Sequence, residues 1–233
     1  MSEDAKPLGR KAYGSIGHLP NSRMGPGDHH ITDGQAIICT QDAGHRRVFV
    51  QTKLDGSCVA VAKIGREIVP LIRAGYRAID SRRAMHHAFH AWAMDCAWLF
   101  DTLLEDGERV VGEWLAVAHG TRYDLTLRPP FVAFDIMREA TRTPTLTTLY
   151  RLKELGFATP DTIPGPVDPE LAMTALNDYG AHPEDGPEGV VYRVESTKRG
   201  ATRVDFLAKW VRPDKVDGKY LSDDDELWNL PIA

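Results

Sequence analysis

The chain has 233 residues, of which 42% are hydrophobic and 26% charged, and its formal net charge is −5 at pH 7. This is an ordinary globular composition, and a chain of this length buries enough surface to fold without a metal or a disulfide. The negative charge argues against a protein that binds polyanions over its whole surface, although a local basic groove would still accept nucleic acid. No stretch approaches the roughly 18 uncharged apolar residues of a transmembrane helix, so no contact with a membrane is expected.

The cysteines and the first residues predict a cytoplasmic protein. Cys39, Cys58 and Cys96 cannot all pair, and none lies in a Cys-x-x-Cys spacing, so reduced thiols are expected. The first 14 residues are polar and lack the apolar core of a signal peptide. Residues 1–46 are rich in Gly and Pro, and we expect a leader that packs on the main domain or continues it.

The first regular elements surround a turn at Lys53. Val48 and Val50 precede the turn and Val59 and Val61 follow it, and this alternation predicts two strands. Residues 68–72 predict another short strand. Ser81 is then the expected N-cap of one long helix that Gly107 ends. Its apolar stripe, with spacings of 4, 3, 4, 3 and 4, consists of Met85, Phe89, Trp92, Cys96, Leu99 and Leu103.

The second half of the chain mixes strands and helices without a regular alternation. Strands are predicted at 110–117, 131–136, 190–194 and 204–211, the last two as a hairpin, and helices at 146–155 and 169–179. Such an uneven mixture indicates an α+β fold rather than alternating βαβ units.

Five short motifs follow one another in a fixed order. Lys-x-Asp-Gly alone is a weak signal, but four further motifs at consistent spacing make the series specific. The motifs are Lys53-Leu54-Asp55-Gly56, Gly112-Glu113-Trp114, Phe131-Val132-Ala133-Phe134-Asp135-Ile136, Glu188-Gly189-Val190-Val191-Tyr192-Arg193 and Ala208-Lys209-Trp210-Val211. The series resembles the ATP-dependent polynucleotide ligases, which are covalent lysyl-nucleotidyltransferases, and among them particularly the RNA ligases.

The resemblance implies a fold and a reaction. The fold is a ligase-type, ATP-grasp-like nucleotidyltransferase domain at 47–213, with antiparallel sheets flanked by helices and a nucleotide cleft between the sheets. Residues 214–233 would be a short tail without an OB-fold. In the implied reaction ATP adenylylates Lys53, AMP passes to an RNA 5′-phosphate, and a 3′-hydroxyl attacks to form a phosphodiester. The alternatives are a DNA ligase or capping-type enzyme with the same lysine, or a non-catalytic nucleotide or RNA binder.

The chemistry of a lysine nucleophile sets requirements on its surroundings. A lysine amine attacks phosphorus only when neutral, whereas an unperturbed ammonium with a pKa of about 10.4 is protonated at pH 7. Desolvation or a nearby cation such as Mg²⁺ or Mn²⁺ would lower this pKa. Asp55 and the Gly56 turn are suited to presenting the side chain of Lys53.

Two carboxylates fall in otherwise apolar strands, where a buried charge needs a partner. The resemblance implies that Glu113 meets the nucleotide ribose and that Glu188 helps to hold the metal, and both are candidate metal ligands. Asp135 has two open interpretations, a role in the site or a hydrogen-bonded acid of the core.

The remaining candidates would bind the nucleotide and RNA. The resemblance implies that Phe134 stacks on the base, where a core position is the alternative, and that Arg73 grips ribose and the 5′-phosphate. Lys209 would offset charge at the α-phosphate. Many relatives have Lys-x-Lys here, whereas this chain has Val211, so either Arg212 substitutes or one phosphate contact is missing. The expected catalytic residues are Lys53, Glu188 and Lys209, and the expected nucleotide ligands are Thr52, Lys53, Asp55, Arg73, Glu113, Phe134, Glu188 and Lys209.

Two further features have weaker interpretations. The leader sequence from His18 to Asp28 resembles that of a bacterial or phage RNA ligase group, although a Gly-Pro-Gly loop is usually only a loop. His86 and His90 share one helical face, but no further ligand follows at zinc spacing, so packed or surface histidines are expected. The implied partner is RNA with 5′-phosphate and 3′-hydroxyl ends, and the sequence leaves a partner protein or a homodimer open.

Overall fold

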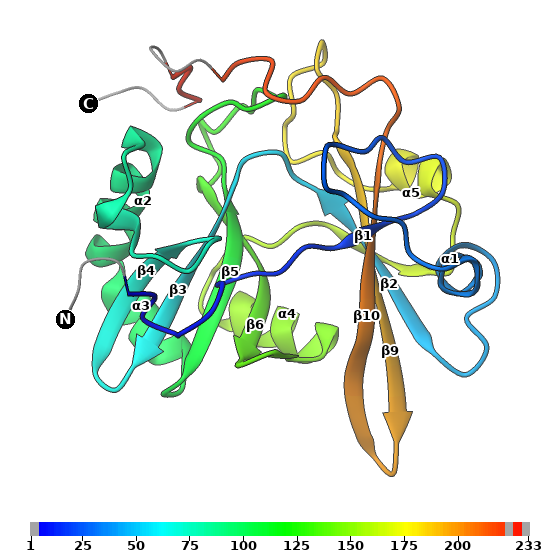
Figure 1. The fold of residues 1–233 in the computed structure, drawn as a ribbon, viewed down its shortest axis with the longest axis horizontal. Coiled ribbons are helices and arrows are strands. Elements are labelled where there is room, and N and C mark those ends of the chain that lie inside the picture. The colour runs from blue at the N-terminus through cyan, green and yellow to red at the C-terminus, as the bar shows by residue number, and fades with distance from the viewer. Residues whose placement is uncertain (1–4, 222–225, 230–233) are drawn as a thin grey trace. The chain divides into compact units, whose positions relative to one another are not determined.

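The computed structural model describes residues 5–221 and 226–229 (Figure 1). Within these residues the chain forms two compact units. Unit 1 comprises the described residues of 1–14, 56–117 and 128–159, and unit 2 those of 15–55, 118–127 and 160–233. Each unit contains one five-stranded sheet with its own helices, which is the α+β architecture predicted from the sequence.

The sheet of unit 1 is antiparallel throughout, in the order β4-β3-β5-β6-β7. Its strands are β3 (Ser57–Ile64), β4 (Glu67–Ile72), β5 (Glu108–Trp114), β6 (Phe131–Arg138) and β7 (Thr141–Arg142). The short 3₁₀ helix η1 (Ala78–Asp80) follows β4, and α4 (Thr145–Glu154) follows β7. The strands predicted at 68–72 and 131–136 and the helix at 146–155 are therefore present.

The prediction of one long helix after Ser81 is wrong. The chain forms α2 (Ala84–Asp95) and α3 (Ala97–Leu103), with a break at Cys96, whose φ and ψ are −99° and 14°. Arg83 is the N-cap of α2 and makes no side-chain cap, while the Ser81 hydroxyl accepts a hydrogen bond from the Arg83 N–H. The break shifts the buried face, so that Phe100 is fully buried where the stripe predicted Leu99.

An aromatic cluster holds the helices of unit 1 against its sheet. Phe89 and Trp92 of α2 pack on Trp114 of β5 and Phe131 of β6, with ring centroids 5.3–5.9 Å apart across the helix–sheet contacts. Phe100 of α3 joins Phe131 at 6.2 Å. Large rings at these separations bury much apolar area, which fixes β5 and the carboxylate that it carries.

The sheet of unit 2 has the order β1-β10-β9-β2-β8, in which only β1 and β10 are parallel among the described pairs. Its strands are β1 (Gly17–His18), β2 (Arg47–Lys53), β8 (Thr162–Gly165), β9 (Gly189–Lys198) and β10 (Ala201–Val211). The predicted β9–β10 hairpin is confirmed: Arg199 and Gly200 form its turn with positive φ values of 50° and 81°.

Two helices cover the core of unit 2. They are α1 (Asp33–Thr40) and α5 (Pro169–Ala175), which is shorter than the helix predicted at 169–179. The sequence analysis did not predict α1, although Thr32 and Gln35 form a capping box at its start. Apolar side chains of α1 and α5 pack with those of the sheet, and this core includes Ala36, Cys39, Val48, Val50, Ala172, Val190, Tyr192, Val194 and Trp210. Among the described helices, none has the length and apolar character needed to cross a membrane.

Candidate active site

Lys53 and Glu188 meet at one end of the unit 2 sheet. Lys53 is the last residue of β2 and lies opposite Gly189, the first residue of β9. Glu188 precedes Gly189, and its Oε2 lies 2.5 Å from Nζ of Lys53. Gly189 allows this arrangement because a Cβ there would lie 2.0 Å from the carbonyl oxygen of Trp210 on β10. The antiparallel register therefore brings together two predicted catalytic residues that are far apart in sequence.

The environment of this ion pair is largely closed to solvent. Glu188 is 7% exposed, and burial raises its pKa, although the cation of Lys53 acts in the opposite direction. The side chain of Lys53 is 21% exposed, so the pair is not completely closed to solvent. Because a carboxylate in such a place needs a positive partner, the pair forms a charged centre rather than an ordinary surface contact.

Lys209, the third predicted catalytic residue, belongs to the same electrostatic cluster. Burial lowers the pKa of the Lys209 ammonium and the charge of Lys53 lowers it further, while Asp28 opposes both effects. The Lys209 Nζ lies 3.4 Å from Oδ1 of Asp28. Unit 2 thus places two lysines and their carboxylate partners around the end of β2, β9 and β10.

The leader supplies the partner of Lys209. β1 lies parallel to β10 with His18 opposite Lys209, and the buried His18 ring contacts two leader side chains. Its Nδ1 lies 2.7 Å from Oγ of Ser22, and its Nε2 lies 3.0 Å from Oδ2 of Asp28. Residues 18–28, whose resemblance to a ligase leader was a weak signal, therefore supply Asp28 as the partner of Lys209 and His18 as a contact of Asp28.

Thr52 and Asp55, on either side of Lys53 in sequence, are both tied to other segments of unit 2. The Thr52 hydroxyl donates to the carbonyl of Asn177 at 2.7 Å. The Oδ2 of Asp55 accepts hydrogen bonds from the Gly120 N–H and from Nζ of Lys215, both at 2.9 Å. The N–H of Asp55 donates to the Tyr123 hydroxyl at 2.9 Å.

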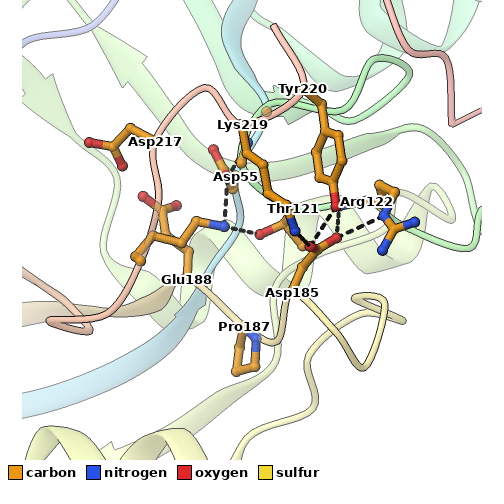
Figure 2. Close-up of polar contacts among 12 residues, drawn as sticks. Asp55, Thr121, Arg122, Asp185, Pro187, Glu188, Asp217, Lys219 and Tyr220 are labelled. Carbon is orange, nitrogen blue, oxygen red and sulfur yellow. Dashed lines mark hydrogen bonds and ion pairs between the residues drawn. The ribbon is translucent and has the colours of Figure 1, made fainter.

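Asp185 is a buried hub that the sequence analysis missed (Figure 2). Its side chain is fully buried and accepts hydrogen bonds from Nε of Arg122 at 3.0 Å, Nζ of Lys219 at 2.8 Å and the Tyr220 hydroxyl at 2.7 Å. Burial raises the pKa of this carboxyl, but these donors outweigh burial and hold the pKa far below its usual range. No local pattern marks this residue, since its partners come from segments distant in sequence.

The other predicted nucleotide ligands lie in unit 1. Glu113 of β5 is partly buried, and its Oε1 accepts the N–H of Gly56 at 3.1 Å. Phe134 of β6 is also partly buried and makes an edge contact with Tyr13 at 5.4 Å between centroids. Arg73 is exposed, and its Nη2 donates to the carbonyl of Gly14 at 3.2 Å.

Asp135 and His86 have structural partners. Asp135 is fully buried, and its Oδ2 accepts from the Tyr13 hydroxyl at 2.9 Å and from Nε of Arg142 at 3.1 Å, which favours the core interpretation. His86 lies between Oγ of Ser57 at 3.1 Å and Oγ of Ser81 at 2.6 Å.

The donor groups fit a magnesium site that depends on nucleotide phosphates. Within residues 5–221 and 226–229, no cluster of three His, Cys, Asp or Glu side chains could hold a metal. Mg²⁺ usually keeps several waters and binds through one or two carboxylates plus phosphate oxygens. Glu188 offers one carboxylate, which is paired with the partly exposed side chain of Lys53, and this is consistent with a site of this kind.

The last motif lacks its second cation at the expected position. Val211 is 5% exposed, and its apolar side chain packs in the sheet. The guanidinium of Arg212 donates to the carbonyl of Pro187 at 2.7 Å, to that of Asp185, and to Oδ2 of Asp214 at 2.6 Å. Arg212 therefore anchors the segment before Glu188.

Comparison with known proteins identifies the family. The sequence model of the family described as RNA ligase matches residues 46–211, a region that contains all five motifs. The chain belongs to the RNA ligase family. Among curated protein sequences, none matches this chain significantly.

Solved structures share the fold of this RNA ligase family member. The Naegleria gruberi RNA ligase with PPi has a TM-score of 0.53 and 16% identity over 84% of this chain and 58% of that chain. A mutant of the same ligase with AMP and Mn has a TM-score of 0.52 and 15% identity, over 89% and 61%. A putative ATP-dependent DNA ligase from Aquifex aeolicus has a TM-score of 0.51 and 14% identity, over 90% and 54%. The RNA ligase family member thus spans between 54% and 61% of the length of these three proteins.

Proposed function

We propose that this chain is an ATP-dependent RNA ligase that works through a covalent Lys53–AMP intermediate. The observation that carries the proposal is the ion pair between Lys53 and Glu188, 2.5 Å long and largely buried, with Lys209 in electrostatic contact. A nucleophilic lysine needs neighbouring cations and restricted solvent to give up its proton near neutral pH. Lys209 is such a cation and the pair is largely shielded from solvent, whereas Glu188 favours the ammonium, so the proposed attack requires the metal to draw the Glu188 carboxylate away from Lys53.

In the first step the neutral amine of Lys53 attacks the α-phosphorus of ATP. A P–N bond forms, the P–O bond to the β-phosphate breaks, and pyrophosphate leaves with the electron pair. The proton of the ammonium passes to solvent, which reaches the 21% of the Lys53 side chain that stays exposed. Lys209 offsets the negative charge that develops on the phosphate in the transition state.

The remaining predicted residues have proposed roles in binding. Glu113 receives the ribose, Phe134 stacks on the base, Arg73 contacts ribose and the 5′-phosphate, and Thr52 and Asp55 hold the segment that carries Lys53. Glu188 and Glu113 are the proposed ligands of Mg²⁺ or Mn²⁺, which would supply positive charge beside the phosphates. The Naegleria gruberi RNA ligase was solved with AMP and Mn, which supports a divalent metal here.

The second and third steps complete the seal. An oxygen of the RNA 5′-phosphate attacks the phosphorus of Lys53–AMP, a P–O bond replaces the P–N bond, and the lysine amine is released. The 3′-hydroxyl then attacks the 5′-phosphate of the activated strand, forming the phosphodiester, while AMP departs. Arginine–phosphate contacts would position the strands, and such contacts weaken steeply with salt.

The test is covalent labelling followed by sealing. The protein is incubated with ATP or GTP labelled at the α-phosphate, together with Mg²⁺, and we expect ATP alone to label it. The bond should be lost in acid and kept in alkali, as a phosphoramidate is, and Lys53→Ala should abolish it. Labelling that persists in Lys53→Ala would overturn the proposal.

The polynucleotide is then identified with nicked duplexes that carry RNA or DNA on each side of the nick. Sealing that requires RNA at the nick supports the RNA ligase proposal. Equal sealing of an all-DNA nick would assign a DNA ligase activity instead.

A further inference from the structure

Lys215 is a buried lysine in the segment that follows β10. It is only 2% exposed, although the sequence analysis assigned residues 214–233 to a short tail. Its ammonium lies 2.9 Å from Oδ2 of Asp55 and also donates to the hydroxyl of Thr121. Because a buried ammonium is costly unless it is paired, this position has a specific charge partner rather than a solvated side chain.

Asp55, the partner of Lys215, belongs to the segment that carries Lys53. Its carboxylate accepts from the Gly120 N–H and from Lys215, and its own N–H donates to the Tyr123 hydroxyl. Figure 2 labels Asp55 and Thr121, the two residues that the Lys215 ammonium contacts. Three contacts from other segments therefore fix Asp55, which is two residues from Lys53.

The packing around Gly120 shows that the contact is closely fitted. A Cβ at Gly120 would lie 2.3 Å from the carbonyl oxygen of Val216, 2.9 Å from Oδ2 of Asp55 and 3.0 Å from Cε of Lys215. Only a glycine lets the 215–216 segment approach this closely. The backbone of Lys215 is held as well, since its N–H donates to the carbonyl of Arg212.

We infer that Lys215 is a positioning residue for adenylyl transfer, acting through Asp55 to hold the Lys53 nucleophile in place. The inference rests on the proposed function, because it assigns Lys215 a role in the first step of that reaction. Without the ammonium, the Asp55 carboxylate keeps a buried negative charge beside Gly120 without its cation, and it would turn toward solvent. Lys53, two residues away on the same chain segment, would move with it.

The charge of Lys215 also reaches the partner of the nucleophile. It opposes the rise in the Glu188 pKa that burial causes, and Asp55 contributes to that rise. Titratable groups near Lys53 include Glu188 just before β9, Lys209 on β10 and His18 on β1, and Asp28 pairs with Lys209. Lys53, Lys209 and Lys215 are thus paired with Glu188, Asp28 and Asp55, respectively. The loss of the Lys215 ammonium would leave these six groups with one negative charge in excess.

The experiment compares four variants of the full chain: Lys215→Met, Lys215→Arg, Asp55→Asn and the double variant Lys215→Met/Asp55→Asn. The readouts are the rate of covalent labelling at saturating ATP and Mg²⁺, the KM for ATP, and the thermal midpoint. Lys219→Met is the segment-matched control, because Lys219 lies four residues further on and pairs with Asp185 instead.

We expect Lys215→Met to lower the labelling rate at saturating ATP about 10- to 100-fold, since small misplacements of a reacting group cost about this much. The KM for ATP should change little, because the loss is one of orientation. Lys215→Arg should recover part of the rate. Lys219→Met should label at the wild-type rate, because its side chain does not touch Asp55.

The double variant separates positioning from folding. If Lys215 acts through Asp55, removing Lys215 in the Asp55→Asn background should slow labelling no further, and the two effects should not multiply. The double variant also lacks the uncompensated buried charge, so it remains informative if Lys215→Met fails to fold.

Three outcomes would overturn the inference: labelling of Lys215→Met at the wild-type rate, effects that multiply in the double variant, or equal loss in Lys219→Met. If the wild-type protein itself takes no label from ATP, the proposed function fails instead.

Discussion

The Nζ of Lys53 and the Oε2 of Glu188 lie 2.5 Å apart because β2 ends where β9 begins. The two residues are 135 positions apart in sequence, and the antiparallel register of one sheet brings them together. The same sheet places Lys209 of β10 opposite Val191 of β9, three residues after Glu188, since β9 pairs with both β2 and β10. The charged centre is thus a product of strand pairing rather than of a loop.

Replacing Lys53 should separate the first step from the last. Lys53→Met removes the nucleophile, so covalent labelling should disappear. Sealing of a strand that already carries AMP on its 5′ end should persist, because that step does not use the lysine–AMP bond. A gel assay with a preadenylylated nicked substrate measures this, and a wild-type control on a plain 5′-phosphate shows that the preparation is active. Loss of both activities would place Lys53 in the sealing step as well.

Replacing Glu188 should weaken the chemistry while the fold remains. Glu188→Ala removes the proposed metal ligand and a buried charge of the site, and the labelling rate should fall about 10²–10³-fold. Glu184→Ala is the matched control, since its side chain is 72% exposed and pairs with Arg122 and His182. Circular dichroism checks that both variants are folded. A folded Glu188→Ala protein with near-normal labelling would exclude Glu188 from the site.

Asp185 should be a stability residue rather than a reacting group. Asp185→Asn removes the buried negative charge that Arg122, Lys219 and Tyr220 share and replaces one of its two acceptor oxygens with an NH2 group, and breaking a buried ion pair costs about 3–5 kcal/mol. Urea unfolding measures the free energy of unfolding. Asp214→Asn removes a carboxylate that is 74% exposed, and the expected loss is at most about 1 kcal/mol. Equal losses of unfolding free energy in the two variants would contradict the proposed stabilising role of Asp185.

His18 should make the support of Lys209 sensitive to acid. Burial lowers the pKa of His18 below 6.5, and the charges of Lys209 and Lys53 lower it further, while Asp28 raises it. The unfolded chain therefore binds this proton more readily, so stability is complete above pH 6.5 and declines as the pH falls through the folded pKa. The difference in thermal midpoint between wild type and His18→Gln should shrink as the pH is lowered. A difference independent of pH would contradict this.

Local patterns predicted the strands around the candidate site. The alternating valines on both sides of Lys53 and the Arg199-Gly200 turn are signals within a few residues, and β2, β3 and the β9–β10 hairpin follow them. The break at Cys96 was not visible, because the apolar spacing continues through it, and packing of Phe100 against Phe131 decides the face.

The sequence patterns could not predict contacts between residues that are far apart in the chain. Lys215 lies 160 positions from Asp55, and no spacing rule relates a lysine after the last motif to the acid of the first. The same holds for Asp185 and for the contact of Asp28 with Lys209, both of which depend on segments that only the folded chain brings together. Motif order therefore predicted the identity of the main candidates, and strand pairing and loop packing determined their partners.

The division into two units has a consequence for how the chain acquires its structure. Each unit is assembled from three separate stretches, and the chain passes from unit 2 to unit 1 between Asp55 and Gly56, inside the lysine motif itself. Neither unit can be excised as one continuous fragment. Each must instead close its sheet across intervening chain that belongs to the other. Such non-local closure slows folding, so fragments that end between the stretches should remain unfolded rather than form half an enzyme.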